Sequence, residues 1–414
     1  MSESVVVIGG GAIGATAAYE LARAGHRVTL LERDHAVGLG CSAGTAGLLA
    51  TSHAGTLATP QALREGILWM TKRESPFYVR PSVRIVPWLL RFARAALSSE
   101  QVRRASDLLR TFSRDSLALH AELLASGIPT TLEQRGVLYT YETAKGFEHA
   151  CTSLPQARAL GLTVHELSVA KAKELEPAVA DGLAGCVYSK EESHLDSLRY
   201  VEAIAGAAGA AGAELRLGTE VVGFASEGSR LVELRTTAGP LPLDGATVVL
   251  AAGVWSRGLG RRLGLSIPLE GAKGYHVELA AAESDPRLPI YMHEARVIAT
   301  PYPDRLRLAG TLELAGDDAS IDEIRLGALQ KAGARNLSGL EGREPVHVWR
   351  GFRPTPPDGM PLVGRSRKFP DLVVATGHAM TGVALSPVMA KLVREIVERT
   401  PPSYDLTLLD PDRF

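Results

Sequence analysis

Residues 5–16 read VVVIGGGAIGAT, a β-branched run followed at once by a turn rich in glycine. β-branched residues favour a strand, and the good helix formers over 15–24 predict a helix that stops at Gly25. Residues 26–31 read HRVTLL and predict a second strand, which closes on Glu32. The order of strand, glycine turn, helix, strand and acidic residue predicts a dinucleotide-binding βαβ unit.

Each glycine of the G-x-G-x-x-G pattern has a physical reason. Gly9 permits the tight turn, Gly11 lets a pyrophosphate approach the backbone, and Gly14 lets the helix pack closely on the strand. Ala12 and Ile13 lie in the turn before that helix, whose N-terminus offers free N–H groups and a partial positive charge that favour phosphate. The pattern alone does not distinguish FAD from NAD.

The chain beyond this helix carries two further signals for a dinucleotide. Glu32 lies 18 residues beyond Gly14, where its carboxylate can accept hydrogen bonds from a ribose diol and would repel a 2′-phosphate. The loop 38–47 consists almost entirely of small residues. Small side chains and free N–H groups suit a loop that lies against a planar ring such as a flavin; a flexible surface linker is the alternative.

Composition excludes several classes of protein. The 414 residues include 45 Lys plus Arg and 46 Asp plus Glu, and the net charge of −1 argues against a nucleic-acid-binding protein. Cys41, Cys151 and Cys186 are widely spaced, which excludes a disulfide framework and fits a reducing compartment. No apolar run approaches the roughly 18 residues of a membrane span, and the N-terminus lacks the basic region of a signal peptide. We therefore expect a cytoplasmic protein.

The rest of the chain mixes helical and strand patterns. Helices are expected over 60–125 and 155–180, and strands over 186–188, 215–224, 231–236, 246–252 and within 266–312. A second unit of strand, glycine turn and helix closes the chain, from residue 372 to about Glu398. Because the chain opens and closes with such units, we expect both ends in one domain and the other domain inserted between them.

Four motifs occur in order: VIGGGAIG at 7–14, AAGVWS at 251–256, GFRPTPPDGMP at 351–361 and GHAMTG at 377–382. Together they resemble the FAD-dependent D-amino-acid oxidase family, which includes glycine oxidase, sarcosine oxidase and the D-amino-acid dehydrogenases. The resemblance covers the chain from end to end. The segment KGYH at 273–276 looks most like the dehydrogenase branch.

The resemblance implies an α/β fold with two domains. A Rossmann-like FAD-binding domain would be built from the discontinuous segments 1–80, 190–256 and 345–414. An α+β substrate-binding domain with a mixed sheet would comprise 81–189 and 257–344.

The resemblance also implies FAD as the cofactor and assigns residues to it. Gly9, Gly11, Ala12, Ile13 and Gly14 would hold the pyrophosphate, Glu32 the adenosine ribose with Arg33 beside it, and Val221 the adenine through its backbone. Ser42, Thr45, Ala46, Gly47 and Leu48 would lie along the flavin, and Gly253 and Trp255 beneath the pyrophosphate. Gly377, His378, Met380, Thr381, Gly382 and Val383 would form a turn whose N–H groups reach the flavin pyrimidine oxygen, with Arg353 also near the cofactor.

Arg353 would be the main substrate residue. It matches the family arginine that holds the substrate carboxylate, a task that suits the planar fork of a guanidinium; a structural salt bridge is the alternative. Arg350 does not occupy this Gly-x-Arg-Pro position. This chain has Ile298 where the oxidases place a tyrosine, so Tyr275 is a candidate to supply a hydroxyl or is simply a core residue. His53 is a candidate for contact with the substrate amine.

The remaining polar and basic features receive simpler interpretations. His276 and His293 are expected to be structural, and no His, Asp or Glu pair has metal-ligand spacing, so no metal is predicted. The segment 82–94 is basic and apolar and either packs on its own domain or touches the inner face of a membrane as a peripheral contact.

The residues and the resemblance together predict oxidation of a small D-amino acid, with a proline-type imino acid as one option. A hydride would pass from the α-carbon to flavin N5, and quinone, oxygen or a carrier protein would reoxidise the flavin. One alternative is a secondary-amine oxidase or dehydrogenase acting on sarcosine, glycine or an N-methyl amino acid. Another is a non-catalytic FAD subunit of a complex.

Overall fold

The computed structural model describes residues 2–50, 55–69, 74–159 and 161–414. Its helices are α1 (Ala12–Arg23), α2 (Pro60–Trp69), α3 (Val86–Leu97), α4 (Ser99–Ala125), α5 (Ala144–Ala159), α6 (Val169–Leu175), α7 (Ser197–Ala210), α8 (Ser256–Arg262), α9 (Glu323–Asn336) and α10 (Gly382–Glu398). Short 3-10 helices are η1 (Cys41–Gly44), η2 (Val83–Ile85) and η3 (Gly253–Trp255). The strands are β1 (Ser4–Ile8), β2 (Arg27–Leu31), β3 (Leu48–Leu49), β4 (Phe77–Val79), β5 (Val137–Tyr141), β6 (Val164–Leu167), β7 (Gly185–Ser189), β8 (Ser193–His194), β9 (Glu214–Arg216), β10 (Val221–Glu227), β11 (Arg230–Thr236), β12 (Gly239–Pro242), β13 (Thr247–Leu250), β14 (Glu270–Ala280), β15 (Ile290–Met292), β16 (Val297–Tyr302), β17 (Arg305–Leu314), β18 (His347–Thr355), β19 (Leu362–Arg365) and β20 (Leu372–Thr376).

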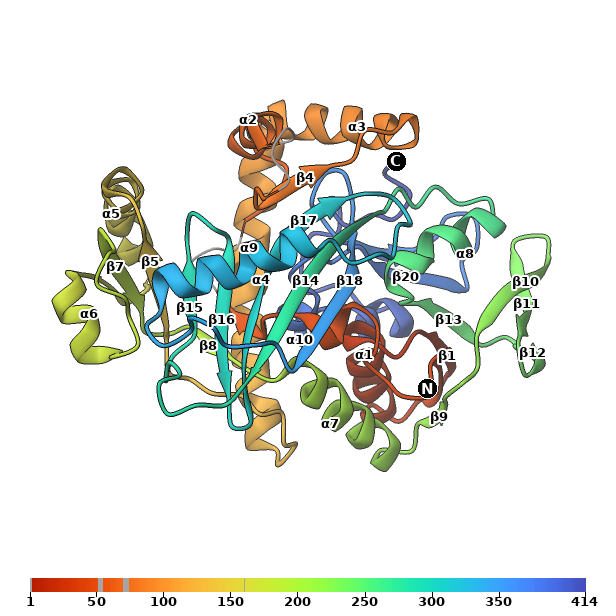
Figure 1. Cartoon of the computed structure of the whole chain (residues 1–414). Coiled ribbons are helices and arrows are strands. Elements are labelled where there is room, and N and C mark those ends of the chain that lie inside the picture. The colour runs from red at the N-terminus through yellow and green to blue at the C-terminus, as the bar shows by residue number, and fades with distance from the viewer. Residues whose placement is uncertain (1, 51–54, 70–73, 160) are drawn as a thin grey trace.

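One sheet joins strands from both ends of the chain, in the order β19-β20-β13-β1-β2-β9, and we call it the parallel sheet. All its neighbours pair in parallel except β19 and β20. Helices α1, α4 and α10 cover one face and share a core that includes Val7, Phe112 and Leu392. The other face packs on α8 and on the antiparallel sheet β10-β11-β12, which lies at the right edge of Figure 1.

A second sheet, which we call the large sheet, runs in the order β18-β14-β17-β16-β15-β5-β7-β6, with β4 pairing to β17. Helix α9 packs against β14, β16 and β17, and α5 and α6 lie at the far left of Figure 1. The long strand β14 pairs antiparallel with β17 on one side and with β18 on the other. Helix α9 and the large sheet enclose a separate hydrophobic core, which includes Val277, Leu308 and Leu329.

The predicted α/β class is confirmed, and so are both units of strand, glycine turn and helix. β1, α1 and β2 form the first, and β20 and α10 form the second. The expectation of continuous helix over 60–125 and 155–180 is wrong, because β4 and β6 interrupt these segments. The domain boundaries stay a prediction; β4 and β18, which those boundaries assign to the FAD-binding domain, pair within the large sheet.

Among the described residues, no helix is both long enough and apolar enough to cross a membrane.

Candidate functional site

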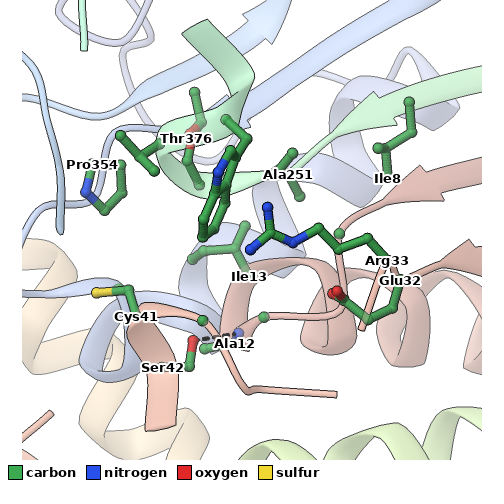
Figure 2. A pocket seen from close by; sticks show the side chains of 18 of the residues that line it. Ile8, Ala12, Ile13, Glu32, Arg33, Cys41, Ser42, Ala251, Pro354 and Thr376 are labelled. Atoms are coloured by element: carbon green, nitrogen blue, oxygen red, sulfur yellow. Dashed lines mark hydrogen bonds between the residues drawn. The ribbon is translucent and has the colours of Figure 1, made fainter. Parts of the chain in front are cut away.

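A cavity lies across the carboxyl ends of β1, β2, β13 and β20, which bring Ile8, Glu32, Ala251 and Thr376 into one lining (Figure 2). In open α/β sheets this edge is where ligands bind. The sequence-predicted residues that line it are Gly9, Gly11, Ala12, Ile13, Glu32, Arg33, Ser42, Thr45, Val221, Gly253, Trp255, Gly377, His378, Met380, Gly382 and Val383.

Two glycines of the first turn are required by contact with backbone. Gly9 has φ +107°, and a Cβ there would lie 2.7 Å from the Ala251 carbonyl oxygen. A Cβ at Gly14 would lie 1.8 Å from the carbonyl oxygen of Gly9. Gly14 does not line the cavity itself; its absent side chain lets α1 approach β1 so that the helix N-terminus faces the cavity.

Glu32 is fixed at the end of β2 by backbone donors. Its carboxylate accepts hydrogen bonds from the N–H of Gly10 at 2.6 Å and of Asp34 at 2.9 Å. Its neighbour Arg33 lies over the ring of Trp255, with the guanidinium carbon 3.6 Å from the ring centroid. The two side chains thereby connect the end of β2 to η3 along one wall of the cavity.

The loop after β2 is held from two sides. On the side of the parallel sheet, Ser42 Oγ accepts a hydrogen bond of 3.0 Å from the N–H of Ala12, the first residue of α1 (Figure 2). On the side of the large sheet, Arg307 donates to the carbonyl oxygens of Ala43 and Thr45 at 3.1 and 2.7 Å. Arg307 is itself nearly fully buried and is held by the carboxylate of Glu278 at 2.7 Å.

Three predicted loop residues lie beyond the cavity lining. The carbonyl of Ala46 accepts from Thr300, and Leu48 pairs with His194 in a short two-stranded sheet. Gly47 has φ +69°, and a Cβ there would lie 1.9 Å from the Leu195 carbonyl oxygen. Their positions fix the end of the loop rather than a wall of the cavity.

A second helix N-terminus meets the same cavity. Gly377 has φ +82° and starts the turn into α10, whose first residues Gly382 and Val383 line the cavity. Thr381 does not line it; its hydroxyl donates to the carbonyl oxygen of His378. Since both α1 and α10 direct their positive ends at one space, the cavity favours a ligand with negative charge.

His378 is buried in this turn. Burial lowers its pKa to about 3, so its ring is neutral at physiological pH. Its Nε2 has no hydrogen-bond partner among the described residues. That orphaned buried nitrogen is an observation that a bound ligand would explain.

Arg353 lies on β18 between Phe352 and Pro354, which line the cavity, but Arg353 is not itself part of the lining. It donates to the carbonyl oxygen of Thr311 at 2.8 Å, and its guanidinium occupies the space where a Cβ at Gly274 would lie, 2.2 Å away. Burial lowers its pKa, and the Cys41 thiol of the cavity lining is close enough to interact with its charge. No carboxylate pairs with Arg353 among the described residues.

The proposed alternative hydroxyl, Tyr275, does not reach the cavity. It lies on the opposite face of β14, fully buried, and donates to Glu313 at 2.6 Å. Burial and that bond raise its pKa. Tyr275 does not line the cavity and packs in the core of the large sheet, so its substrate role stays a prediction that the structure does not support. His53 lies outside the described residues.

The main residues that sequence reasoning missed are Arg307 and Glu278. Each of them is a charged residue within an apolar strand segment. That pattern indicates a buried charge that needs a partner, but it does not show which residue the partner is. Burial and Arg307 lower the pKa of His276, on the same face, to about 3, so this predicted structural histidine is neutral.

Fold and cavity together define a dinucleotide-binding protein with a discontinuous Rossmann-like sheet and a second sheet whose strand β18 brings Phe352 and Pro354 to the cavity. The family model described as "FAD dependent oxidoreductase" (DAO) matches residues 4–396. The chain belongs to this family, and FAD is its cofactor.

Individual relatives agree. The chain is 32% identical to a D-amino acid dehydrogenase of Paramagnetospirillum magneticum, over 99% of this chain and 98% of the relative. It is 29% identical to a D-amino-acid oxidase of Bradyrhizobium diazoefficiens, again over 99% and 98% of the two chains. The crystal structure of glycine oxidase from Geobacillus kaustophilus superposes with a TM-score of 0.80 at 27% identity and covers all of both chains.

The residues present fit FAD. The turn at Gly9 and Gly14 leaves no room for side chains, and two helix N-termini face the cavity. The side chain of Glu32 places its own carboxylate at the end of β2. These are the features that a pyrophosphate and a ribose diol need.

Proposed function

We propose that the chain oxidises the bond between the α-carbon and nitrogen of a small D-amino acid. Two kinds of support exist: the relatives named D-amino acid dehydrogenase and D-amino-acid oxidase, and the placement of Arg353. Bound FAD supplies the acceptor for the hydride that leaves the α-carbon. The product imine then hydrolyses in water to a keto acid and ammonia, or stays cyclic when the substrate is proline-like.

The observation that carries the proposal is the unpaired cation at Arg353. Its side chain is partly buried, has a backbone carbonyl as its described partner, and lies close enough to Cys41 of the cavity lining to interact with it. A desolvated guanidinium without a carboxylate is costly, and a substrate carboxylate would complete it with charge-assisted hydrogen bonds. Arg353 thereby orients the α-carbon, while Gly274 leaves the space that the guanidinium needs.

The residues that would hold the cofactor follow from the same lining. Glu32 would bind the adenosine ribose with Arg33 beside it, Trp255 would lie beneath the pyrophosphate, and the turn at Gly377 would meet the flavin. The chemistry requires a neutral substrate amine and exclusion of water more than a protein base, since only one proton leaves the amine. The α10 N-terminus would stabilise negative charge on the reduced ring.

A surface near α3 bears on the electron acceptor. Trp88, Ala95 and Ala96 pack inward, but Val83, Val86, Leu90 and Leu97 are exposed, beside Arg84, Arg91 and Arg94. An exposed apolar stripe with arginines suits the surface of an anionic bilayer. It supports a membrane quinone as acceptor over oxygen; faster turnover with a quinone analogue than with oxygen would agree with this choice.

The alternative substrate class is a secondary amine or glycine, and the likeness to a glycine oxidase structure favours it next. Both classes carry a carboxylate, so Arg353 serves either. The direct test is the visible spectrum of the purified chain under anaerobic conditions, with D-amino acids, L-amino acids, D-proline and sarcosine added separately. Bleaching by D-amino acids supports the proposal, bleaching by sarcosine or glycine alone selects the alternative, and bleaching by none rejects both.

Substitution of Arg353 tests the carboxylate role. A hydrogen bond to a charged group contributes about 1.5–3 kcal/mol, so Arg353→Leu should raise KM for the amino acid about tenfold to about a hundredfold. Arg350→Leu is the matched control, because Arg350 lies on the opposite face of the same strand, paired with Tyr275. If the two substitutions raise KM equally and the FAD content is unchanged, Arg353 does not bind the substrate carboxylate.

A further inference from the structure

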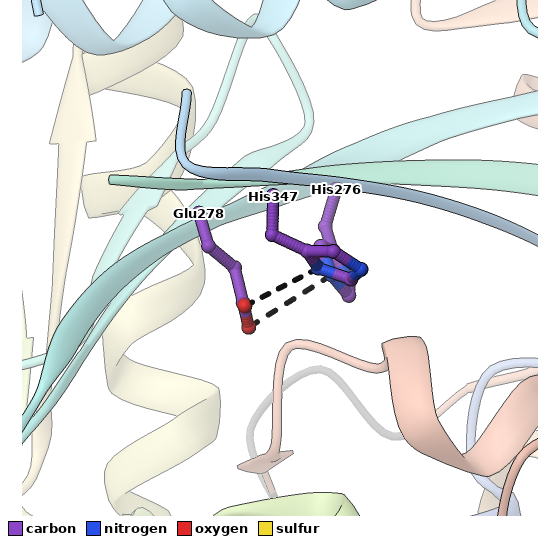
Figure 3. Close-up of side chains that lie close together, drawn as sticks. All are labelled: His276, Glu278 and His347. Carbon is purple, nitrogen blue, oxygen red and sulfur yellow. Dashed lines mark ion pairs between the residues drawn. The ribbon is translucent and has the colours of Figure 1, made fainter. Parts of the chain in front are cut away.

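Three potential metal ligands meet at the end of the large sheet, outside the cofactor cavity. His276 and Glu278 lie on β14, and His347 opens the neighbouring strand β18 (Figure 3). Their ligand atoms all lie within 4.8 Å of one another. One carboxylate oxygen of Glu278 is 3.3 Å from His347 Nδ1, and the other is 3.9 Å from His276 Nε2.

The hydrogen bond made by His276 Nδ1 leaves the other ring nitrogen, Nε2, free to act as a metal ligand. A carbonyl oxygen can only accept, so the contact of 3.4 Å between Nδ1 and the carbonyl of Gly44 places the proton on Nδ1. Nε2 then carries a lone pair. The residue is 1% exposed, and Nε2 has no partner among the described residues. Metal-binding histidines are commonly held in this way, with the other ring nitrogen donating to a backbone carbonyl.

The local charge permits a cation. Glu278 accepts from Arg305 and Arg307 on one oxygen, and Asp196 pairs with Arg305 at 2.6 Å. The two arginines and the two carboxylates balance, so a divalent ion would enter a neutral surrounding rather than a positive one. The second oxygen of Glu278 faces His347.

We propose that His276, Glu278 and His347 form a binding site for one zinc ion. Two imidazoles and one carboxylate are a ligand set that zinc accepts, with water in the fourth position. With bonds of about 2.0–2.1 Å, tetrahedral ligand atoms stand about 3.4 Å apart. Glu278 Oε2 and His347 Nδ1 are already 3.3 Å apart, whereas the oxygen 3.9 Å from His276 Nε2 is Oε1, which Arg305 and Arg307 hold. The side chain of His347 is 55% exposed and has room to turn inward for the remaining adjustment.

The site joins β14 to β18 and reaches the cofactor loop through Gly44. Ligand spacing along the sequence does not reveal this cluster, because His347 is far from Glu278 in the chain and strand pairing brings the two side by side. The proposal is independent of the substrate class, since none of its three ligands lines the cofactor cavity.

The test is calorimetric titration of the FAD-loaded chain, without an affinity tag and after dialysis against EDTA, with zinc chloride. One zinc ion per chain is expected. His347→Gln should bind zinc at least roughly tenfold more weakly, because loss of a ligand should cost at least as much as loss of an outer-shell partner. His165→Gln is the control: His165 is an exposed histidine on β6, and its substitution should leave zinc affinity unchanged.

Because His347 is exposed, its substitution should not prevent folding, and the flavin absorbance of each variant verifies this. Absence of stoichiometric binding by the unsubstituted chain would overturn the proposal. Equal affinity in His347→Gln would also overturn it, since zinc would then be held by other groups such as the free cysteines. A matching loss in His165→Gln would show that histidine content rather than this cluster determines binding.

Discussion

Substitution of Gly14 by alanine tests whether contact between α1 and β1 positions the cofactor. A Cβ at this position would lie 1.8 Å from the Gly9 carbonyl oxygen, 1.2 Å inside the 3.0 Å limit that real Cβ contacts observe. The Gly9 oxygen belongs to the backbone, and the Cβ is attached rigidly to the backbone of α1. Neither can turn away, so the first turn of α1 must move by about that distance. Hydrogen bonds tolerate only about 0.5 Å, from 2.7 to 3.2 Å, so at least one bond from the helix N-terminus to the pyrophosphate should be lost.

A hydrogen bond to a charged group contributes about 1.5–3 kcal/mol, which predicts FAD affinity at least about tenfold lower in Gly14→Ala. Overpacking should also lower the free energy of unfolding by about 1–3 kcal/mol. FAD titration of the apoprotein, followed by flavin fluorescence, measures the affinity.

Gly206→Ala is the matched control for this substitution. Gly206 is an exposed helical glycine of α7, and a Cβ there meets nothing within 4 Å. Its replacement should leave FAD binding unchanged and stabilise the chain by about 0.5–1 kcal/mol. Gly14→Ala with FAD affinity within twofold of the unsubstituted chain, and the same unfolding temperature, would refute the reasoning.

Two further predictions concern the cavity wall and the core. Trp255→Leu removes the ring beneath the Arg33 guanidinium; such a contact contributes about 0.5–1 kcal/mol at a partly exposed site, so the free energy of unfolding in urea should fall by about that amount. His120 is fully buried against the carbonyl of Ala384, and burial lowers its pKa to about 4. Between pH 6.5 and about 4 the unfolded chain binds the extra proton, so stability should fall as pH falls through this window. Urea unfolding of His120→Asn should show a slope shallower by about one proton, or about 1.4 kcal/mol per pH unit; an unchanged slope would mean that His120 is protonated in the folded chain.

The two ends of the chain could be predicted from sequence because their signals are local. The turn at Gly9, the helix after it and the acidic Glu32 are all specified within one βαβ unit, and the structure brings them into one cavity lining. The turn at Gly377 before α10 is the same kind of local signal. Strand pairing then places the two units side by side through β13.

The misplaced residues depend on information that is not local. Alternation along β14 puts neighbouring residues on opposite faces, but the sequence does not say which face meets the cavity. The structure turns Gly274 and His276 toward the cofactor loop and Tyr275 toward Glu313. Strand β4 was missed because its pairing with β17 lies far along the chain.

The buried ion pair of Arg307 and Glu278 shows why the two sheets cannot act independently. Arg307 belongs to the large sheet, yet it donates to the carbonyls of Ala43 and Thr45 in the loop that lines the cofactor cavity. Glu278 holds this guanidinium, and Arg307 in turn contributes to the lowering of the Glu278 pKa to about 2. Removal of one partner from such a pair costs about 3–5 kcal/mol, because the other charge stays buried. The large sheet, which carries the proposed substrate residue Arg353, therefore also fixes the cofactor loop, so a movement of that sheet would shift Arg353 and the cavity wall together.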